Sequence, residues 1–145
     1  MSNTKNNRLK LTSFGGLSRS QLMARITSFK NASTELKMVV LLRDHGLTGW
    51  RRHYPILGRP DFTWPAVRVA LFVDGCFWHG CPRHYETPKS NIQFWRGKVM
   101  NNKRRDRKIN EKLRQDGWTV LRVWECRIHE SRTAKRIIRV ICRIE

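Results

Sequence analysis

The chain has 145 residues, 39% of them hydrophobic, and a formal net charge of +19 that comes from 30 lysines and arginines against 11 acids. This length suits a single domain with a modest core, and no apolar run approaches the roughly 20 residues of a membrane span. A charge this far from neutral predicts a polyanionic partner, nucleic acid first of all. The alternative is a basic protein whose charge only keeps it in solution.

The N-terminal part of the chain is polar and basic, and no acid precedes Glu35. We expect residues 1–17 to form a flexible arm and residues 18–145 to form one domain. A secretory signal would need an apolar centre near the start, and none is present. We therefore expect an intracellular, cytoplasmic protein associated with the nucleoid, in which disulfides are disfavoured.

Apolar periodicity and turn residues predict seven elements along the chain. In chain order they are a helix over 31–47, strands over 50–54, 60–64 and 67–73, a helix over 91–116, a strand over 118–125 and a helix over 133–142. Asn31 or Ser33 can cap the first helix, and Gly46 and Gly117 stop the two longer ones.

The connections between these elements predict an α/β fold. The strands over 60–64 and 67–73 are separated by a short turn that contains Pro65, so we expect them to pair antiparallel. The helix over 91–116 separates the third strand from the fourth, which implies a parallel crossover. The expected architecture is a small mixed sheet sandwiched by helices.

Two carboxylates stand at the ends of the predicted hairpin strands. Asp61 follows a Gly-Arg-Pro sequence at the start of one strand, and Val73 and Asp74 close the other. Pairing would bring these ends together, and carboxylate and carbonyl oxygens suit Mg²⁺, which can assist hydrolysis of a phosphodiester. The alternative for Asp61 is a turn acid that caps backbone amides.

His79 is the second reactive candidate. Histidine exchanges protons readily near neutral pH, so His79 suits a general base. A histidine base needs an orienting partner, and Asp106, the lone acid of a basic helical stretch, can supply it. Because Cys81 is only two residues away, the competing interpretation of His79 is a zinc ligand.

The cysteines indicate a metal. Cys76, Cys81 and His84 form a C-x4-C-x2-H pattern, and Cys126 stands at the end of the last strand. Four such donors suit structural zinc, although the spacing is not that of a standard zinc finger; buried free cysteines are the alternative. Cys142 lies on the isoleucine-rich face of the last predicted helix, so we expect it in the core.

Two Phe-Trp pairs flank this region. Phe77 and Trp78 fall in a predicted loop, and the pair at 94–95 stands beside Lys98 and Asn102. Packing is the usual role of an aromatic side chain. Next to a basic groove, however, such side chains can stack on bases or wedge between base steps.

Several of these blocks together resemble the very-short-patch-repair (Vsr) DNA mismatch endonucleases. The resemblance lies in "GRPDF", "FVDGCFWHGCP", "FW..K...N...RD" and "GWTVLRVWEC", with weaker likeness in "RSQLMARI" and "STEL". It covers roughly residues 18–128. It implies a restriction-endonuclease-like fold, Mg²⁺-dependent nicking of double-stranded DNA and a structural Zn²⁺.

The resemblance also implies roles for individual residues around the catalytic metal. Asp61 would be the Mg²⁺ ligand, with the backbone carbonyl of Val73 completing the protein ligands. Glu35 would lie near the metal through water. His79 would be the base, supported by Asp106.

The same resemblance implies a DNA-contacting set. The intercalating aromatics would be Phe77, Trp78 and Trp95, and Lys98 and Asn102 would lie next to the DNA. The expected substrate is a duplex with a T:G mismatch that arises from deaminated 5-methylcytosine. We further expect a monomer that works with accessory mismatch-repair proteins.

The chain departs from the family pattern at two places. A threonine–histidine pair is replaced by Val73 and Asp74, and Asp74 could add a carboxylate to the Mg²⁺ site. Cys81 stands where the family has a histidine, which shifts the next zinc ligand to His84. The predicted zinc set is therefore Cys76, Cys81, His84 and Cys126.

Three functional hypotheses follow from the sequence. The first is a mismatch-specific nicking endonuclease. The second keeps the Glu–Asp–His–Asp centre but cuts at a specific sequence or serves a mobile element. The third is a zinc-stapled DNA-binding module without catalysis.

Overall fold

The computed structural model describes residues 34–143, so the predicted arm over 1–17 and the predicted caps Asn31 and Ser33 lie outside the described residues. Residues 34–44 are helical. The elements that follow are β1 (Phe62–Trp64), β2 (Val69–Asp74), α2 (Cys76–His79), α3 (Ile92–Gln115), β3 (Thr119–Trp124), a 3-10 turn (Glu125–Arg127) and α4 (Ser131–Ile141). None of the helices in this part of the chain is both long and apolar enough to cross a membrane.

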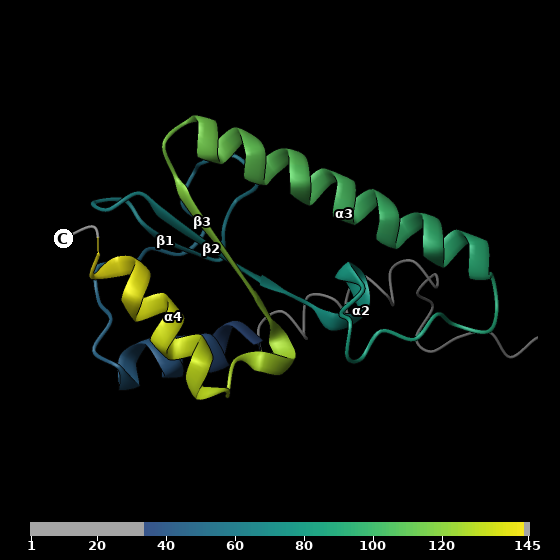
Figure 1. The fold of residues 1–145 in the computed structure, drawn as a ribbon, viewed down its shortest axis with the longest axis horizontal. Helices are drawn as coiled ribbons and strands as arrows, with labels where there is room; N and C mark the ends of the chain where they lie inside the picture. Colours follow the sequence, from purple (N-terminus) through teal and green to yellow (C-terminus); the bar gives the residue numbers. More distant parts are fainter. Residues whose placement is uncertain (1–33, 144–145) are drawn as a thin grey trace, which may run out of the picture.

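The sheet has the order β1-β2-β3 (Figure 1). β2 pairs antiparallel with β1, with Phe62 opposite Leu71, and parallel with β3, with Asp74 opposite Trp124. The predicted hairpin and parallel crossover are thus confirmed. The strand expected over 50–54 is wrong, because these residues contribute only the single bridge from Arg51 to Thr63. β3, the strand predicted over 118–125, lies at the edge of the described sheet.

Helices cover both faces of the sheet, as the sequence predicts. Alternate residues of a strand point to opposite faces. Val69 and Leu71 therefore join a core with residues of the 34–44 helix and of α4, whereas Ala70 and Phe72 pack with Leu113 of α3. Figure 1 shows α3 along one side of the sheet and α4 on the other.

The helix ends follow the glycines, but two local expectations fail. Gly46 and Gly117 have φ of 66° and 83°, the left-handed conformation that ends a helix. Residues 76–79, predicted as loop, form one helical turn. Cys142 is exposed rather than in the core, because it follows the last helical residue and sits beside the face that Ile137 and Ile141 bury.

A glycine lies where α2 packs against α3. Gly80 ends α2 with φ of 66°, and a Cβ atom there would lie 2.8 Å from Val99 Cγ1 and 3.1 Å from Lys103 Cε. The close approach of the two helices therefore requires glycine at this position. Gly97, inside α3, has open space around the same atom.

We predict that Gly80→Ala lowers the free energy of unfolding by at least about 1–2 kcal/mol, because it adds a Cβ to a left-handed residue in a crowded position. Gly97→Ala should raise it by up to about 1 kcal/mol through helix propensity alone. Urea denaturation measures both. Equal effects of the two alanines would contradict the packing described here.

Candidate active site

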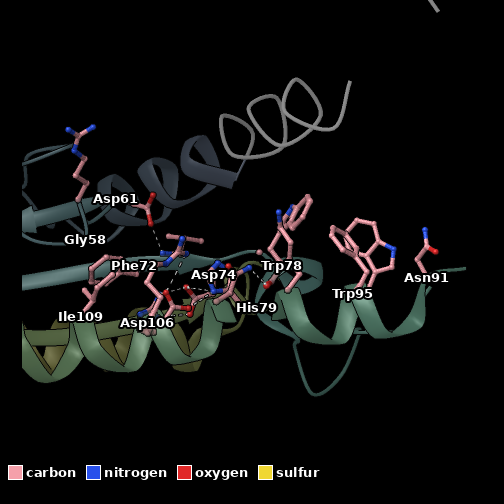
Figure 2. A pocket seen from close by; sticks show the side chains of 18 of the residues that line it. Gly58, Asp61, Phe72, Asp74, Trp78, His79, Asn91, Trp95, Asp106 and Ile109 are labelled. Atoms are coloured by element: carbon pink, nitrogen blue, oxygen red, sulfur yellow. Dashed lines mark hydrogen bonds and ion pairs between the residues drawn. The ribbon is translucent and has the colours of Figure 1, made fainter. Parts of the chain in front are cut away.

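A cleft of about 1100 Å³ opens between the ends of β1 and β2, the short helix α2 and one face of α3. Most of the predicted site residues line it: Asp61, Val73, Asp74, Trp78, His79, Trp95, Lys98, Asn102 and Asp106. Figure 2 shows Asp74, His79 and Asp106 pointing toward one another, with Trp78 and Trp95 farther along the cleft. Glu35 and Phe77 are not among the lining residues.

Asp61 and Val73 meet where the hairpin begins. The Val73 N–H donates a 2.6 Å hydrogen bond to Asp61 Oδ2. Continuing the register of β1 and β2 puts Pro60 opposite Val73, and proline has no N–H to donate to the Val73 carbonyl. The Val73 carbonyl therefore receives no sheet hydrogen bond from residue 60, on the same side of β2 as the Asp61 carboxylate.

Burial is the main influence on the pKa of Asp61. It raises the pKa of this carboxyl above its usual value, and the negative charge of Asp74 adds to the rise. The hydrogen bond from Val73 and the nearby His53 act in the opposite direction. Desolvation penalises the ionised carboxylate. A cation bound at Asp61 would stabilise that ionised form.

His79 and Asp106 form a tight pair across α2 and α3. His79 Nδ1 lies 2.6 Å from Asp106 Oδ2 and 3.8 Å from Asp74 Oδ1. An ionised carboxylate can only accept, so we assign the proton to Nδ1, which leaves the lone pair of a neutral ring on Nε2. Among residues 34–143, Nε2 has no hydrogen-bonding partner, so it is free to take a proton.

Arg122 on β3 is the member of the site that the sequence analysis missed. Its Nε and Nη2 donate to the two carboxylate oxygens of Asp74, at 2.8 and 2.9 Å, and Nη2 also lies 3.2 Å from Asp106 Oδ1. Nη1 donates to Asn110, and the guanidinium lies 4.7 Å from the centre of the Phe72 ring. Burial opposes its charge, but the two carboxylates outweigh burial and raise the pKa of Arg122.

This ion pair bears on the predicted metal contact of Asp74. Both of its carboxylate oxygens already accept from Arg122, and the side chain is only 10% exposed. Any contact with Mg²⁺ would have to use the remaining lone pairs. Metal ligation by Asp74 stays a prediction.

Glu35 does not line the cleft in the described structure. It projects from the helix of residues 34–44, forms an ion pair with Arg52 and lies 4.0 Å from His53 Nε2. His53 in turn contributes to the electrostatics of Asp61. These contacts place Glu35 near His53, and its role near the metal stays a prediction.

An aromatic cluster forms one end of the cleft. The Phe77 ring packs between Trp78 and Trp95, with centroids 5.2 Å from each, and the two tryptophans are 6.1 Å apart. Phe94 lines the cleft, lies 5.2 Å from Trp95 and is 60% exposed. The sequence pointed to Phe94 through its pairing with Trp95, but only Trp95 was predicted to contact DNA.

Lys98 and Asn102 hold positions next to this cluster. Asn102 Nδ2 donates a 2.8 Å hydrogen bond to the Trp78 carbonyl, so one of its amide hydrogens fixes α2 on α3. Lys98 Nζ lies 6.0 Å from the centre of the Trp78 ring. Lys98 is exposed, and its charge faces the cleft opening.

Beyond α2, the four predicted zinc ligands come together. The donor atoms of Cys76, Cys81, His84 and Cys126 all lie within 4.8 Å of one another. Cys81 Sγ is 3.8 Å from Cys126 Sγ and 3.9 Å from His84 Nδ1. Ligands about 2.3 Å from a tetrahedral Zn²⁺ are about 3.8 Å apart, so the donors fit that ion.

The thiol chemistry of this cluster is also suited to a cation. Although burial opposes it, hydrogen bonds from the backbone of Arg83 and His84 and from the His84 side chain help lower the pKa of Cys81 to about 6. Burial raises the pKa of Cys76. A thiolate among neutral donors is a ready ligand for a soft divalent metal.

Known proteins match this chain over much of its length. Residues 13–85 match the family model described as DNA mismatch endonuclease Vsr. The chain is 36% identical over 114 residues to Type II nicking enzyme V.XorIIP of Xanthomonas oryzae pv. oryzae, covering 77% of this chain and 82% of that enzyme. It is 35% identical over 109 residues to DNA mismatch endonuclease Vsr of Escherichia coli, covering 74% and 69%.

A third relative matches a shorter stretch at higher identity. Type II nicking enzyme V.NaeI of Lentzea aerocolonigenes is 49% identical over 67 residues, which span 46% of this chain but only 40% of that enzyme. The family match and the relatives with long coverage agree with one another. The chain belongs to the Vsr DNA mismatch endonuclease family and is a DNA endonuclease.

Proposed function

We propose that the protein nicks one DNA strand next to a T:G mismatch by Mg²⁺-dependent hydrolysis of a phosphodiester. The observation that carries this proposal is one cleft that combines the Asp61–Val73 pair, the His79–Asp106 pair and a cluster of aromatic rings. The first two supply hydrolytic chemistry, and the third supplies surface that can stack on opened bases. Membership in the Vsr family supports a restriction-endonuclease-like fold around this cleft.

Asp61 and the Val73 carbonyl would hold the cation. Their oxygens are the hard ligands that Mg²⁺ prefers, and Pro60 leaves the carbonyl without one ladder donor. Bound Mg²⁺ would supply an acidified water and offset negative charge on the phosphate. Glu35, held by Arg52, would act on this site only through intervening groups.

His79 would accept the proton of the attacking water at Nε2. Asp106 fixes the ring through the 2.6 Å contact at Nδ1 and stabilises the positive charge that the ring gains. Arg122 holds the other oxygen of Asp106 and so restrains the carboxylate. The pair therefore keeps its geometry while a proton moves.

The aromatic cluster would provide selectivity for a mismatch. Trp78, Trp95 and the exposed Phe94 line the cleft, while Phe77 packs against both tryptophans. Inserting a ring between base steps requires unstacking, which costs roughly a few kcal/mol and costs least at a mismatched step. Lys98 and Asn102 would contact the backbone beside the opened step. We propose that the protein acts on the DNA as a monomer.

We also propose that Cys76, Cys81, His84 and Cys126 bind a structural Zn²⁺. The 3.8 and 3.9 Å separations among their donors support this assignment. The ion would join the start of α2 and the loop after it to the turn that follows β3. A non-catalytic binding module, by contrast, does not fit a family of endonucleases.

The first prediction from the proposed function tests which duplex is the substrate. With Mg²⁺ and duplexes that differ only in one T:G or C:G pair, we expect nicking of the T:G duplex alone, scored on a denaturing gel. The second candidate from the sequence is an endonuclease that nicks at a specific, fully matched sequence. Equal cleavage of both duplexes would reject mismatch selectivity and support that candidate.

The second prediction concerns Asp61→Asn, which keeps the shape of the side chain and its acceptor for the Val73 N–H. We expect nicking to fall by at least about 100-fold, the upper range for residues that only support metal ligands. Single-turnover assays would measure it, and duplex binding should persist. Wild-type turnover by the variant would remove Asp61 from the mechanism.

The same variant has a pH-dependent effect on stability. Since burial raises the folded-state pKa of Asp61, the fold favours the neutral acid, and ionisation costs stability as pH rises through that pKa. Asp61→Asn should therefore be at least as stable as the wild type at neutral pH, and this advantage should vanish toward acid pH. Asp44→Asn, at an exposed site, serves as the control in urea titrations.

The third prediction tests the zinc. Cys126→Ser should reduce the bound zinc, measured by elemental analysis, and lower the melting temperature, since structural zinc contributes to folding directly. Cys142→Ser is the matched control because Cys142 is exposed and outside the donor cluster. Unchanged zinc in Cys126→Ser would refute the ligand assignment.

A further inference from the structure

A second, smaller groove adjoins the cleft on the surface of α3. It has a volume of about 460 Å³ and lies between α3 and the chain at Leu57, with Arg104, Lys108 and Lys112 along it. Arg105 and Ile109 line both the groove and the cleft, so the two are continuous. None of the groove's lining residues is acidic.

Helical spacing gathers these cations on one flank of α3. Residues 104, 105, 108 and 112 recur at intervals of one, three and four, which keeps them on a single stripe. Asp106 and Leu113 face the sheet and the site. Arg107 and Arg114 fall on the opposite flank, and no groove-lining residue lies there.

Two of the groove cations have no ion-pair partner within residues 34–143. Arg105 lies 3.7 Å from Asp106, and Lys112 lies 3.1 Å from Asp116. Within residues 34–143, Arg104 and Lys108 have no ion-pair partner, and both are exposed. Their charges are therefore available to an external anion.

The wall opposite α3 is apolar and held in place. Leu57 is 48% exposed, next to Gly58, which has φ of 78°. A Cβ at Gly58 would meet Ile109 Cγ2 at 2.6 Å, so the chain here packs closely on α3. The groove thus pairs a row of cations with an exposed apolar side chain.

We propose that this groove binds the sugar–phosphate backbone of the duplex that flanks the cleavage site on one side only. The stripe from residue 104 to residue 112 extends about 12 Å at 1.5 Å per residue. Phosphates of one strand recur about every 3.4 Å along the duplex axis, so three or four of them match this length. The proposal relies on the DNA endonuclease activity of the family and on neither the mismatch nor the Mg²⁺ assignment.

The test compares two double variants that remove the same charge from the same helix. Arg104→Gln/Lys108→Gln alters the groove, and Arg107→Gln/Arg114→Gln alters the opposite flank. Binding to a fully matched duplex without divalent metal would be measured by fluorescence anisotropy between 50 and 200 mM salt. Thermal unfolding would establish that these exposed substitutions leave the fold intact.

We expect the groove variant to bind on the order of tenfold more weakly, with a salt slope smaller by about 1.8, because each lost phosphate contact removes about 0.9. The opposite-flank variant should retain its affinity and slope. Equal losses would show an effect of net charge alone and would overturn the proposal. Unchanged binding of the groove variant would overturn it as well.

The one-sided arrangement has a separate test. Shortening the duplex arm that reaches the groove should weaken binding by the wild type but not by the groove variant, while shortening the other arm should affect both alike. Equal sensitivity of the wild type and the groove variant to both arms would overturn the proposal. At saturating DNA the groove variant should nick as fast as the wild type, which separates this result from any failure of the catalytic assignments.

Discussion

A single guanidinium, that of Arg122, organises the acidic centre of the cleft. It bridges Asp74 on β2 and Asp106 on α3 from its own position on β3. Without it, two carboxylates that are only 10% and 13% exposed would face each other with like charge. Removing one partner of a buried ion pair typically costs about 3–5 kcal/mol, so both the sheet edge and the His79–Asp106 geometry depend on this residue.

The position of His79 depends on a second constraint, the anchoring of α2. Four residues of helix are too few to be stable by themselves. At one end the Cys76 N–H donates a 2.8 Å hydrogen bond to Glu125, Gly80 allows the other end to approach α3, and Asn102 donates to the carbonyl of Trp78. The catalytic candidate and the aromatic surface therefore share one small element that is fixed from three sides.

The sequence was sufficient where pattern and covalent chemistry determine structure. Two apolar segments and the turn at Pro65 predicted the hairpin, and that hairpin brought Asp61 to Val73. The C-x4-C-x2-H pattern predicted three donors close together, and Cys126 at the end of the last predicted strand completed the cluster of four.

Other features depend on tertiary contacts that a linear pattern does not contain. Arg122 stands in an apolar strand as an isolated cation, and only the pairing of β2 with β3 shows which carboxylates it meets. The α2 turn is defined by its neighbours rather than by its own periodicity. Likewise, the pairing of Glu35 with Arg52 involves a segment predicted as strand that forms only one bridge.

The charges of the cleft bear on how an endonuclease accepts its substrate. Asp61, Asp74 and Asp106 all line the proposed site for a DNA phosphate, although the chain as a whole carries +19. Arg122 offsets one of these negative charges, and Asp61 lies apart from its fork, desolvated and without an ion pair in residues 34–143. The basic flank of α3 can attract the duplex but does not neutralise that carboxylate. A divalent cation at Asp61 would balance both the carboxylate and the phosphate, which is why the charge arrangement favours metal-assisted hydrolysis over a site that uses His79 alone.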